Sequence, residues 1–175
     1  IGKPLAIALD AYAPKGYKVN PEMISSAYRK WYAEQGRLGL QDEPLYPGMF
    51  KLINDLKNHK EFNIGVATNK SRIALNNGLN KHNLNEIFDI TLTMEEANPK
   101  PDPDMAIQAM SKLNIEKKST VIVGDTINDI GLGVNAGINS IGVAWGYNSI
   151  EMLKNEGADF IVKNSKELFD KIISL

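Results

Sequence analysis

Apolar and polar positions divide the chain into a first part with one clear helix and a longer part in which helices and strands alternate. In the first part, Asn20 can cap a helix and Pro21 fits its first turn, and apolar residues recur at helical spacing over residues 23–32. Gly36 and the next glycine along the chain are expected to end this helix. The Pro- and Gly-containing segment 41–48 then predicts a linker.

From Met49 onwards the pattern switches repeatedly between the period of a helix and that of a buried strand. Helices are predicted over residues 49–58, 71–82, 103–113, 125–136, 150–155 and 165–173, and strands over residues 62–67, 88–92, 120–123, 140–144 and 159–162. Such alternation indicates an α/β fold of the Rossmann-like, doubly wound class. A parallel sheet core over residues 46–175 would carry helices on its faces, joined by right-handed crossovers.

Two of the predicted helices carry a signal about packing. The first one after the linker is expected to place Phe50, Ile53 and Leu56 on its apolar side. A later one contains Gly131 and Gly133, which do not follow a strand and therefore fail the dinucleotide-binding fingerprint. Small residues at these positions would instead let the helix approach the sheet closely.

Composition narrows the classes of function. The chain has 175 residues, 43% of them hydrophobic and 23% charged, with a net charge of −1. These values are typical of one globular domain, or of one domain with a small appendage. They give no electrostatic signal for nucleic acid or an anionic membrane, and no apolar run approaches the ~20 residues of a membrane span. The chain has no cysteine and only two histidines, which excludes thiolate and His-rich metal sites. The cytoplasm is the expected location and a small molecule the expected partner.

Two carboxylates follow the strand predicted over residues 120–123. The apolar run stops at Gly124, and Asp125 and Asp129 come next, four residues apart. At the carboxyl end of a parallel strand, two acids on one face of a helical path suit a hard cation such as Mg²⁺. An ordinary helix start remains the alternative, with Asp125 as its cap and Asp129 near the positive end of the helix dipole.

A hydroxyl and an amide follow the strand predicted over residues 62–67. Thr68 and Asn69 precede a helix whose free N–H groups and dipole favour an anion. Thr68 could bind one phosphate oxygen and Asn69 a second oxygen or another substrate group. The alternative is that these residues, with Ser71, only cap the helix.

A lysine between two prolines follows the strand predicted over residues 88–92. Pro99 and Pro101 stiffen the backbone around Lys100, and its ammonium could neutralise phosphate charge. A rigid turn with a solvated lysine is the alternative. Three successive strand ends would therefore present a hydroxyl, a lysine and a pair of carboxylates to the same edge of the sheet.

In this arrangement the chain resembles the haloacid dehalogenase superfamily, in its branch of phosphoglycolate phosphatase-like hydrolases. The segments that are similar to the family's motifs are Ala67-Thr68-Asn69-Lys70, Asn98-Pro99-Lys100-Pro101, Gly124-Asp125-Thr126-Ile127-Asn128-Asp129, Gly142-Val143-Ala144-Trp145-Gly146-Tyr147 and Gly157-Ala158-Asp159. The resemblance implies a core over residues 46–175 and a small helical cap, here partial, over residues 1–45. It also implies a Mg²⁺-dependent phosphatase that hydrolyses a small phosphomonoester through an aspartyl-phosphate.

The resemblance also implies a role for each residue that matches a motif. Thr68 would bind the phosphoryl oxygens with Asn69 beside it, and Lys100 would position the nucleophile and offset charge. Asp125 would ligate Mg²⁺, and Asp129 would orient the groups around the metal. Lys3 matches none of these motifs. By the resemblance of its position, it would contact a carboxylate or a second phosphate of the substrate.

The family's first motif, Asp-x-Asp-x-Thr at the end of its first strand, has no match in the sequence. Asp10 follows an apolar run, but the residues after it are Ala, Tyr and Ala, so it is expected to belong to a cap helix. The segment Ile1-Gly2-Lys3-Pro4 looks like a part of the cap that comes after the first motif. We therefore expect the first strand to be absent from these residues, an amino-terminal extension to carry the nucleophile, and the 175 residues alone to be inactive.

Alternatives to the phosphatase remain open at this point. One is a non-catalytic protein of the same fold, or a truncated fragment, that uses the cleft for binding or as a scaffold. Another is a sugar-phosphate mutase of the same superfamily, since the intermediate can pass its phosphoryl group to a sugar. Phosphoglycolate, pyrophosphate, sugar phosphates and nucleoside monophosphates all fit as substrates, and the oligomeric state is open. A receiver-like switch is disfavoured because its acidic cluster near the start of the chain is missing.

Overall fold

The computed structural model describes residues 20–37 and 43–175, and the chain divides between Pro44 and Leu45 into two compact units. In the first unit the described helix is α2, Pro21–Arg37. The Asn20 side chain accepts hydrogen bonds from the backbone N–H groups of Glu22 and Met23, at 3.0 and 3.2 Å, which confirms the predicted cap. The helix runs through Gly36 instead of ending there. Lys3 and Asp10 lie outside the described residues.

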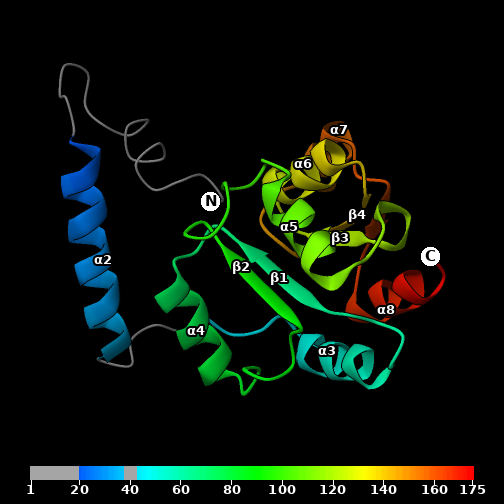
Figure 1. The fold of residues 1–175 in the computed structure, drawn as a ribbon, viewed down its shortest axis with the longest axis horizontal. Helices are drawn as coiled ribbons and strands as arrows, with labels where there is room; N and C mark the ends of the chain where they lie inside the picture. The colour runs from blue at the N-terminus through cyan, green and yellow to red at the C-terminus, as the bar shows by residue number, and fades with distance from the viewer. Residues whose placement is uncertain (1–19, 38–42) are drawn as a thin grey trace. The chain divides into compact units, whose positions relative to one another are not determined.

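The second unit alternates helices and strands, as the sequence predicts (Figure 1). Its elements are α3 Met49–Asn58, β1 Gly65–Thr68, α4 Arg72–Lys81, β2 Ile90–Thr93, α5 Asp104–Leu113, the 3₁₀ helix η1 Lys117–Ser119, β3 Val121–Gly124, α6 Ile127–Ala136, β4 Asn139–Val143, α7 Ile150–Glu156, β5 Phe160–Val162 and α8 Ser165–Ile173. Every strand pair is parallel, and the observed bounds differ from the predicted ones by a few residues.

The strands form two parallel sheets instead of one. One sheet pairs β1 with β2, and the other has the order β3-β4-β5. Within residues 20–37 and 43–175, β1 therefore has no neighbour on the side away from β2, and β3 none on the side away from β4. Every residue of β3 is only half-buried, although three of the four are Val or Ile. Both open edges belong to strands that end at candidate site residues.

Helices cover both faces of the sheets, which is the arrangement of a doubly wound fold. On one face, α5 and α6 pack their apolar residues against β2, around the fully buried Met105 and Leu132. On the other face, α3 and α8 pack against β4 and β5, around Ile141 and Leu168. Figure 1 shows α5, α6 and α7 together on one side of the unit, with α3 and α8 on the other.

Both packing expectations are confirmed only in part. Gly133 does allow a close approach to the sheet, because a Cβ there would lie 2.6 Å from Cγ2 of Ile122 in β3, whereas a Cβ on Gly131 would meet Pro101 and Glu156 instead of a strand. The apolar side expected for α3 is wrong in part: Leu52 and Leu56 are buried, whereas Phe50 is 51% exposed. Positions 52 and 56 are one helical turn apart and meet the sheet together, which turns Phe50 outward.

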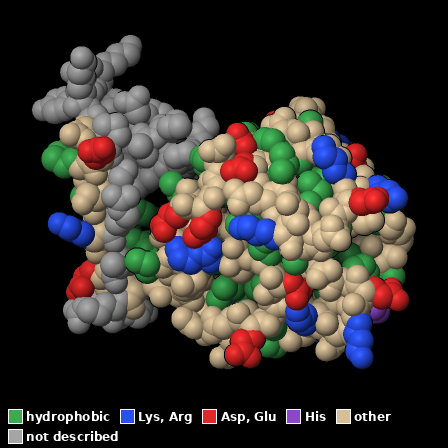
Figure 2. Space-filling view, in the orientation of Figure 1, with side chains coloured by type: hydrophobic (Ala, Val, Ile, Leu, Met, Phe, Trp, Pro, Cys, Tyr) green, Lys and Arg blue, Asp and Glu red, His purple; other side chains and the backbone are tan. Residues whose placement is uncertain are grey.

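The surface is mixed in charge. On the face of the second unit drawn in Figure 2, basic and acidic side chains are interspersed, in keeping with the net charge of −1. In the part of the chain that the structure covers, no helix has both the length and the apolar character that crossing a membrane requires.

Candidate functional site

The predicted site residues lie where the strands of the second unit end. Thr68 is the last residue of β1, Lys100 lies in the segment between β2 and α5, and Asp125 directly follows β3. Asp129 lies in the first turn of α6. In a parallel α/β sheet, the carboxyl ends of the strands are the edge at which ligands bind.

The Lys100 ammonium joins the end of β1 to the start of α6. Its Nζ donates to the carbonyl oxygen of Ala67 at 2.8 Å and to Oδ1 of Asp129 at 2.5 Å. The side chains of Lys100 and Asp129 are only 13% and 9% exposed. Lys100 is therefore not the solvated lysine of a surface turn, and residues from all three predicted strand ends meet through its two contacts.

The backbone of Lys100 is held by Asn69. The Lys100 N–H donates to Oδ1 of Asn69 at 2.8 Å, and Nδ2 of Asn69 donates to the Lys100 carbonyl oxygen at 3.1 Å. The sequence predicts Asn69 as a second contact for phosphate, and the structure shows its amide on the lysine peptide. Ser71 caps α4 by accepting from the N–H of Ala74 at 3.3 Å, while Thr68 Oγ1 accepts from the N–H of Lys70 at 3.2 Å.

Asp129 serves a second purpose at the start of α6. Its Oδ2 accepts from the N–H and the hydroxyl of Thr126, at 3.0 and 2.7 Å, and the Thr126 hydroxyl lies 3.4 Å from the N–H of Asp129. This reciprocal pair is a capping box, so Thr126 is the cap of α6. The alternative in which Asp125 caps the helix is therefore wrong.

Asp125 is fixed by the loop that follows β4. Its Oδ2 accepts from the N–H of Tyr147 at 3.0 Å, and its carbonyl oxygen accepts from the N–H of Asn148 at 3.1 Å. Asn148 in turn accepts from the N–H of Ile127 at 2.8 Å, which ties this loop to α6. Oδ1 of Asp125 accepts a hydrogen bond from none of the described residues. One oxygen of a half-buried carboxylate is thus left for a ligand.

Two glycines make room for these carboxylates. A Cβ on Gly124 would lie 2.0 Å from Cβ of Asp129, and a Cβ on Gly146 would lie 2.0 Å from Cβ of Asp125. Real Cβ atoms do not approach so closely, so only glycine allows either aspartate its observed position. Both glycines fall within segments that resemble motifs, and close approach is the physical reason for their identity here.

The oxygen donors of this site fit a Mg²⁺ ion that is bound jointly by the protein and by a substrate. Within the described residues, no group of three His, Cys, Asp or Glu side chains gathers to hold a metal. Mg²⁺ does not require such a cage, because it keeps several waters and binds through one or two carboxylates and substrate phosphates. Asp125 could supply one such carboxylate, whereas both oxygens of Asp129 are engaged by Lys100 and Thr126.

Comparison with known proteins identifies the family. The profile of the haloacid dehalogenase-like hydrolases matches residues 1–143. The chain belongs to the haloacid dehalogenase-like hydrolases. Among curated relatives, the pyrophosphatase PpaX of Bacillus velezensis is 29% identical over 124 residues, and PpaX of Anoxybacillus flavithermus is 31% identical over 170 residues. These alignments cover 70% and 96% of this chain, and 57% and 75% of the relatives.

A solved structure agrees with this membership. A protein of Clostridium acetobutylicum, described as a predicted phosphatase, superposes with a TM-score of 0.82 at 29% sequence identity. The superposition covers 99% of this chain and 79% of that protein. The Rossmann-like α/β fold predicted for this haloacid dehalogenase-like hydrolase is thereby confirmed. The chain spans only part of the length of each of these relatives.

Sequence reasoning missed three residues around the site of this hydrolase. Tyr46, predicted to lie in the linker, has a pKa above its usual range because of burial and then because of the nearby Asp125 and Tyr147. Asn135 of α6 donates to the carbonyl oxygen of Pro101 at 2.9 Å, beside Lys100. The third is Thr126, the cap of α6. A hydroxyl three residues before Asp129 was the one signal that could have identified the capping box.

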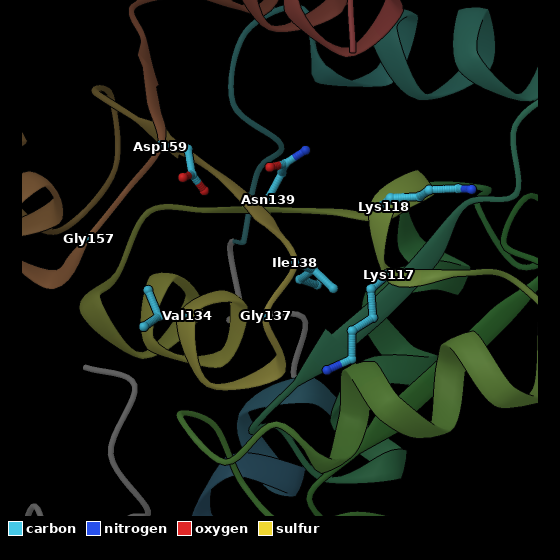
Figure 3. Close-up of a pocket in the computed structure, with 8 residues that line it drawn as sticks. All are labelled: Lys117, Lys118, Val134, Gly137, Ile138, Asn139, Gly157 and Asp159. Atoms are coloured by element: carbon cyan, nitrogen blue, oxygen red, sulfur yellow. The ribbon is translucent and has the colours of Figure 1, made fainter.

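A cavity of about 320 Å³ lies at the opposite edge of the sheet. Its lining comes from residues that precede β3, β4 and β5, including Lys117, Gly137 and Asp159. Figure 3 shows Lys117 and Lys118 pointing in different directions, with Asp159 on the far side of the view from both. The Asp159 carboxylate accepts hydrogen bonds from the N–H and the hydroxyl of Ser140. Its polar groups do not converge on a common point, so this cavity is not a candidate for the chemistry of the family.

Proposed function

We propose that this protein is a Mg²⁺-dependent phosphatase that hydrolyses a small phosphorylated metabolite through an aspartyl-phosphate. The observation that carries the proposal is the buried ammonium of Lys100, held between Ala67 at the end of β1 and Asp129 at the start of α6. A cation held in place at the carboxyl ends of the strands, where Thr68 and Asp125 also lie, suits phosphoryl transfer, in which negative charge must be bound and offset.

Each group of the chain has a distinct task in this proposal. The hydroxyl of Thr68 binds a phosphoryl oxygen, because it can donate its hydrogen while its oxygen accepts from the N–H of Lys70. The N–H groups of Arg72 and Ala74 at the start of α4 are already bound, to Glu95 and Ser71. Lys100 offsets the charge of the phosphoryl group and holds the attacking carboxylate, and Asp129 keeps the ammonium in place. Loss of such a preorganised charge typically raises the barrier by about 3–4 kcal/mol, a factor of roughly 100–1000 in rate.

Asp125 would hold the Mg²⁺ through the carboxylate oxygen that accepts no hydrogen bond from the described residues. When bound, the metal would polarise the phosphoryl oxygens and neutralise their charge. The loop after β4 contributes by fixing Asp125 through the N–H groups of Tyr147 and Asn148. This carboxylate therefore meets the ligand in one orientation, without a cost of ordering at the moment of reaction.

In this proposal, none of the 175 residues supplies the attacking carboxylate. The 175 residues contain no Asp-x-Asp-x-Thr segment, and among the described residues β1 and β3 each have an edge without a partner strand. We propose that the nucleophile is carried by a strand between these edges, where it would lie beside Lys100. We propose accordingly that these 175 residues alone turn over no phosphate ester.

Pyrophosphate and small phosphomonoesters such as phosphoglycolate are the first substrates to test. Two relatives are named pyrophosphatases, which favours pyrophosphate for this chain. We propose residues 1–45 as a partial helical cap that selects the substrate, with Lys3 as a contact for its second anionic group. A cytoplasmic location and the lack of nucleic-acid or membrane partners stay predictions.

Phosphate release tests this function. The chain should be compared with the same chain extended at its amino terminus by an apolar strand that ends in Asp-x-Asp-x-Thr, with Mg²⁺ or with EDTA. Turnover is expected only for the extended chain with Mg²⁺. Lys100→Ala and Asp125→Asn should each lower it about 100- to 1000-fold, and Lys118→Ala, at a lysine that is 80% exposed, should not.

Four results would contradict the proposal. Turnover that persists in EDTA would exclude the metal, and full turnover by Lys100→Ala would exclude the proposed role of the ammonium. A well-folded extended chain that binds phosphate esters with Mg²⁺ but never hydrolyses them would favour the non-catalytic alternative. Transfer of the phosphoryl group from one sugar hydroxyl to another, with no free phosphate, would instead identify a mutase.

A further inference from the structure

We infer that Asn69 is a positioning residue, which acts through Lys100 and not on the substrate. The inference rests on the proposed function for its meaning in catalysis, but its structural part stands on the geometry of the chain alone. Asn69 follows the last residue of β1, and its side chain spans both polar backbone atoms of Lys100. The ammonium of the same lysine lies on Ala67, two residues before Asn69.

The two hydrogen bonds of Asn69 run in opposite directions. Its Oδ1 accepts from the Lys100 N–H at 2.8 Å, and its Nδ2 donates to the Lys100 carbonyl oxygen at 3.1 Å. A carboxamide is suited to this task because it carries an acceptor and a donor side by side. An aspartate would make the first bond but turn a second oxygen toward the Lys100 carbonyl oxygen, and an alanine would make neither.

The prolines on both sides make the Asn69 bond the central attachment of this loop. Neither Pro99 nor Pro101 has a backbone N–H, so the Lys100 N–H is the one backbone donor of the three residues. The carbonyl oxygens beside it are also bound, that of Pro99 by the N–H of Asp102 at 3.1 Å and that of Pro101 by Asn135 at 2.9 Å. The stiff segment thus has few ways to move once Asn69 holds it.

Lys100 is therefore attached to the end of β1 at three points, two through its backbone and one through its ammonium. Freeing the backbone would leave the four-carbon side chain to find Ala67 and Asp129 from a loop that can shift. The consequence for chemistry is specific. Asn69 fixes where the Lys100 ammonium lies relative to the phosphoryl group. Substitution of Asn69 should therefore lower turnover only through its effect on Lys100, and by no more than the loss of Lys100 itself.

The first test needs no activity. In the 175-residue chain labelled with ¹⁵N, the ammonium of a buried, paired lysine gives a signal that solvated lysines lose by rapid exchange with water. Lys100→Met assigns the signal. We expect it to be present in the unchanged chain and in Asn76→Ala, an exposed asparagine of α4. It should be lost in Asn69→Ala and weakened in Asn69→Asp.

A persistent Lys100 ammonium signal at an unchanged shift in folded Asn69→Ala would overturn the inference. Far-ultraviolet circular dichroism checks that the variant is folded. If Asn69→Ala does not fold, Asn69→Asp takes its place, because it keeps one of the two bonds. An unchanged Lys100 ammonium signal in Asn69→Asp then counts equally against the inference, because the hydrogen bond from Asn69 Nδ2 to the Lys100 carbonyl oxygen would have no effect on the ammonium.

The second test uses turnover by the extended chain. Asn69→Ala should lower kcat about 10- to 100-fold, a typical effect of losing a group that orients a ligand residue, with little change in KM. In the Lys100→Ala background the same substitution should change kcat by less than about twofold, because Asn69 then has nothing to position. Additive losses, or a raised KM in both backgrounds, would show that Asn69 binds the substrate directly.

The two tests separate the inference from the proposed function. If the protein is not a phosphatase, no variant turns over substrate, yet the ammonium signal still depends on Asn69. If the inference fails but the proposed function holds, the extended chain turns over substrate and the losses of activity from Asn69→Ala and Lys100→Ala are additive. The Lys100 ammonium signal is then the same with and without Asn69.

Discussion

The ion pair between Lys100 and Asp129 should contribute far more to stability than the pairs on the surface. Both side chains are at most 13% exposed, whereas those of the Lys166–Asp170 pair are 85% and 60% exposed. Breaking a buried pair by removing one partner leaves a charge without compensation and costs about 3–5 kcal/mol. Breaking an exposed pair of neighbours on a helix costs little by comparison, because water and salt screen its charges.

A double-mutant cycle measures this difference. Lys100→Met keeps most of the length of the side chain without its charge, and Asp129→Asn keeps an oxygen for the Thr126 cap. Each should lower the free energy of unfolding by about 3 kcal/mol, and the double variant by about the same amount, not by about 6 kcal/mol. Urea unfolding followed by circular dichroism gives these values, with Lys166→Met as the matched control.

Two outcomes would refute the reasoning. If each single substitution costs less than about 1 kcal/mol, the ammonium is not buried against the carboxylate. If the two costs simply add, the residues do not interact and the ends of β1 and β3 are not joined through them.

Other predictions concern residues around the site. Glu96 has a pKa of about 2, lowered first by hydrogen bonds from the Arg72 guanidinium and then by those from Thr93. A lowered pKa stabilises the fold above the usual carboxyl pKa near 4.5 and loses that effect as the pH falls toward 2. Because the Glu96 side chain is 36% exposed, solvent screens its interactions, and Glu96→Gln should lower the free energy of unfolding by only about 1–2 kcal/mol at neutral pH, measured in urea. An equal loss near pH 2 would contradict this prediction. Gly146→Ala should cost about 1–3 kcal/mol and weaken metal binding by displacing Asp125. Its control, Gly78→Ala in α4 with open space around the new Cβ, should gain about 0.5–1 kcal/mol; a loss at Gly78, or none at Gly146, would count against the packing described.

The sequence predicts the alternation of elements because each rests on a local signal. The repeat of apolar residues defines the helices and strands. Asn20 marks the start of α2 through its side-chain oxygen, and Gly137 marks the end of α6 through its backbone conformation. Gly137 has a φ of +68°, in the left-handed region that glycine favours. These preferences are local and do not depend on the rest of the fold, so the elements predicted from them are also found in the structure.

The details of the site could not be predicted in the same way. An asparagine after a strand suits a helix cap, a phosphate contact or a clamp on another loop equally well, and only the position of Lys100 decides among them for Asn69. Tyr46 and Asp125 are far apart in the sequence and are brought together by the fold. The error at Phe50 has a related cause: its spacing suits several apolar faces of α3, and the sheet beneath selects Leu52 and Leu56.

The central claim is that Asp125 and Lys100 face one site for a cation and a phosphoryl group. Adding Mn²⁺ and inorganic phosphate to the ¹⁵N-labelled chain tests it directly, because Mn²⁺ takes the same oxygen ligands as Mg²⁺ and broadens nearby amide signals. We predict that the amides of Asp125, Thr126 and Tyr147 broaden first, followed by that of Lys100, and that Asp125→Asn abolishes the effect. Broadening centred on the cavity beside Gly137, or unchanged broadening in Asp125→Asn, would contradict the account.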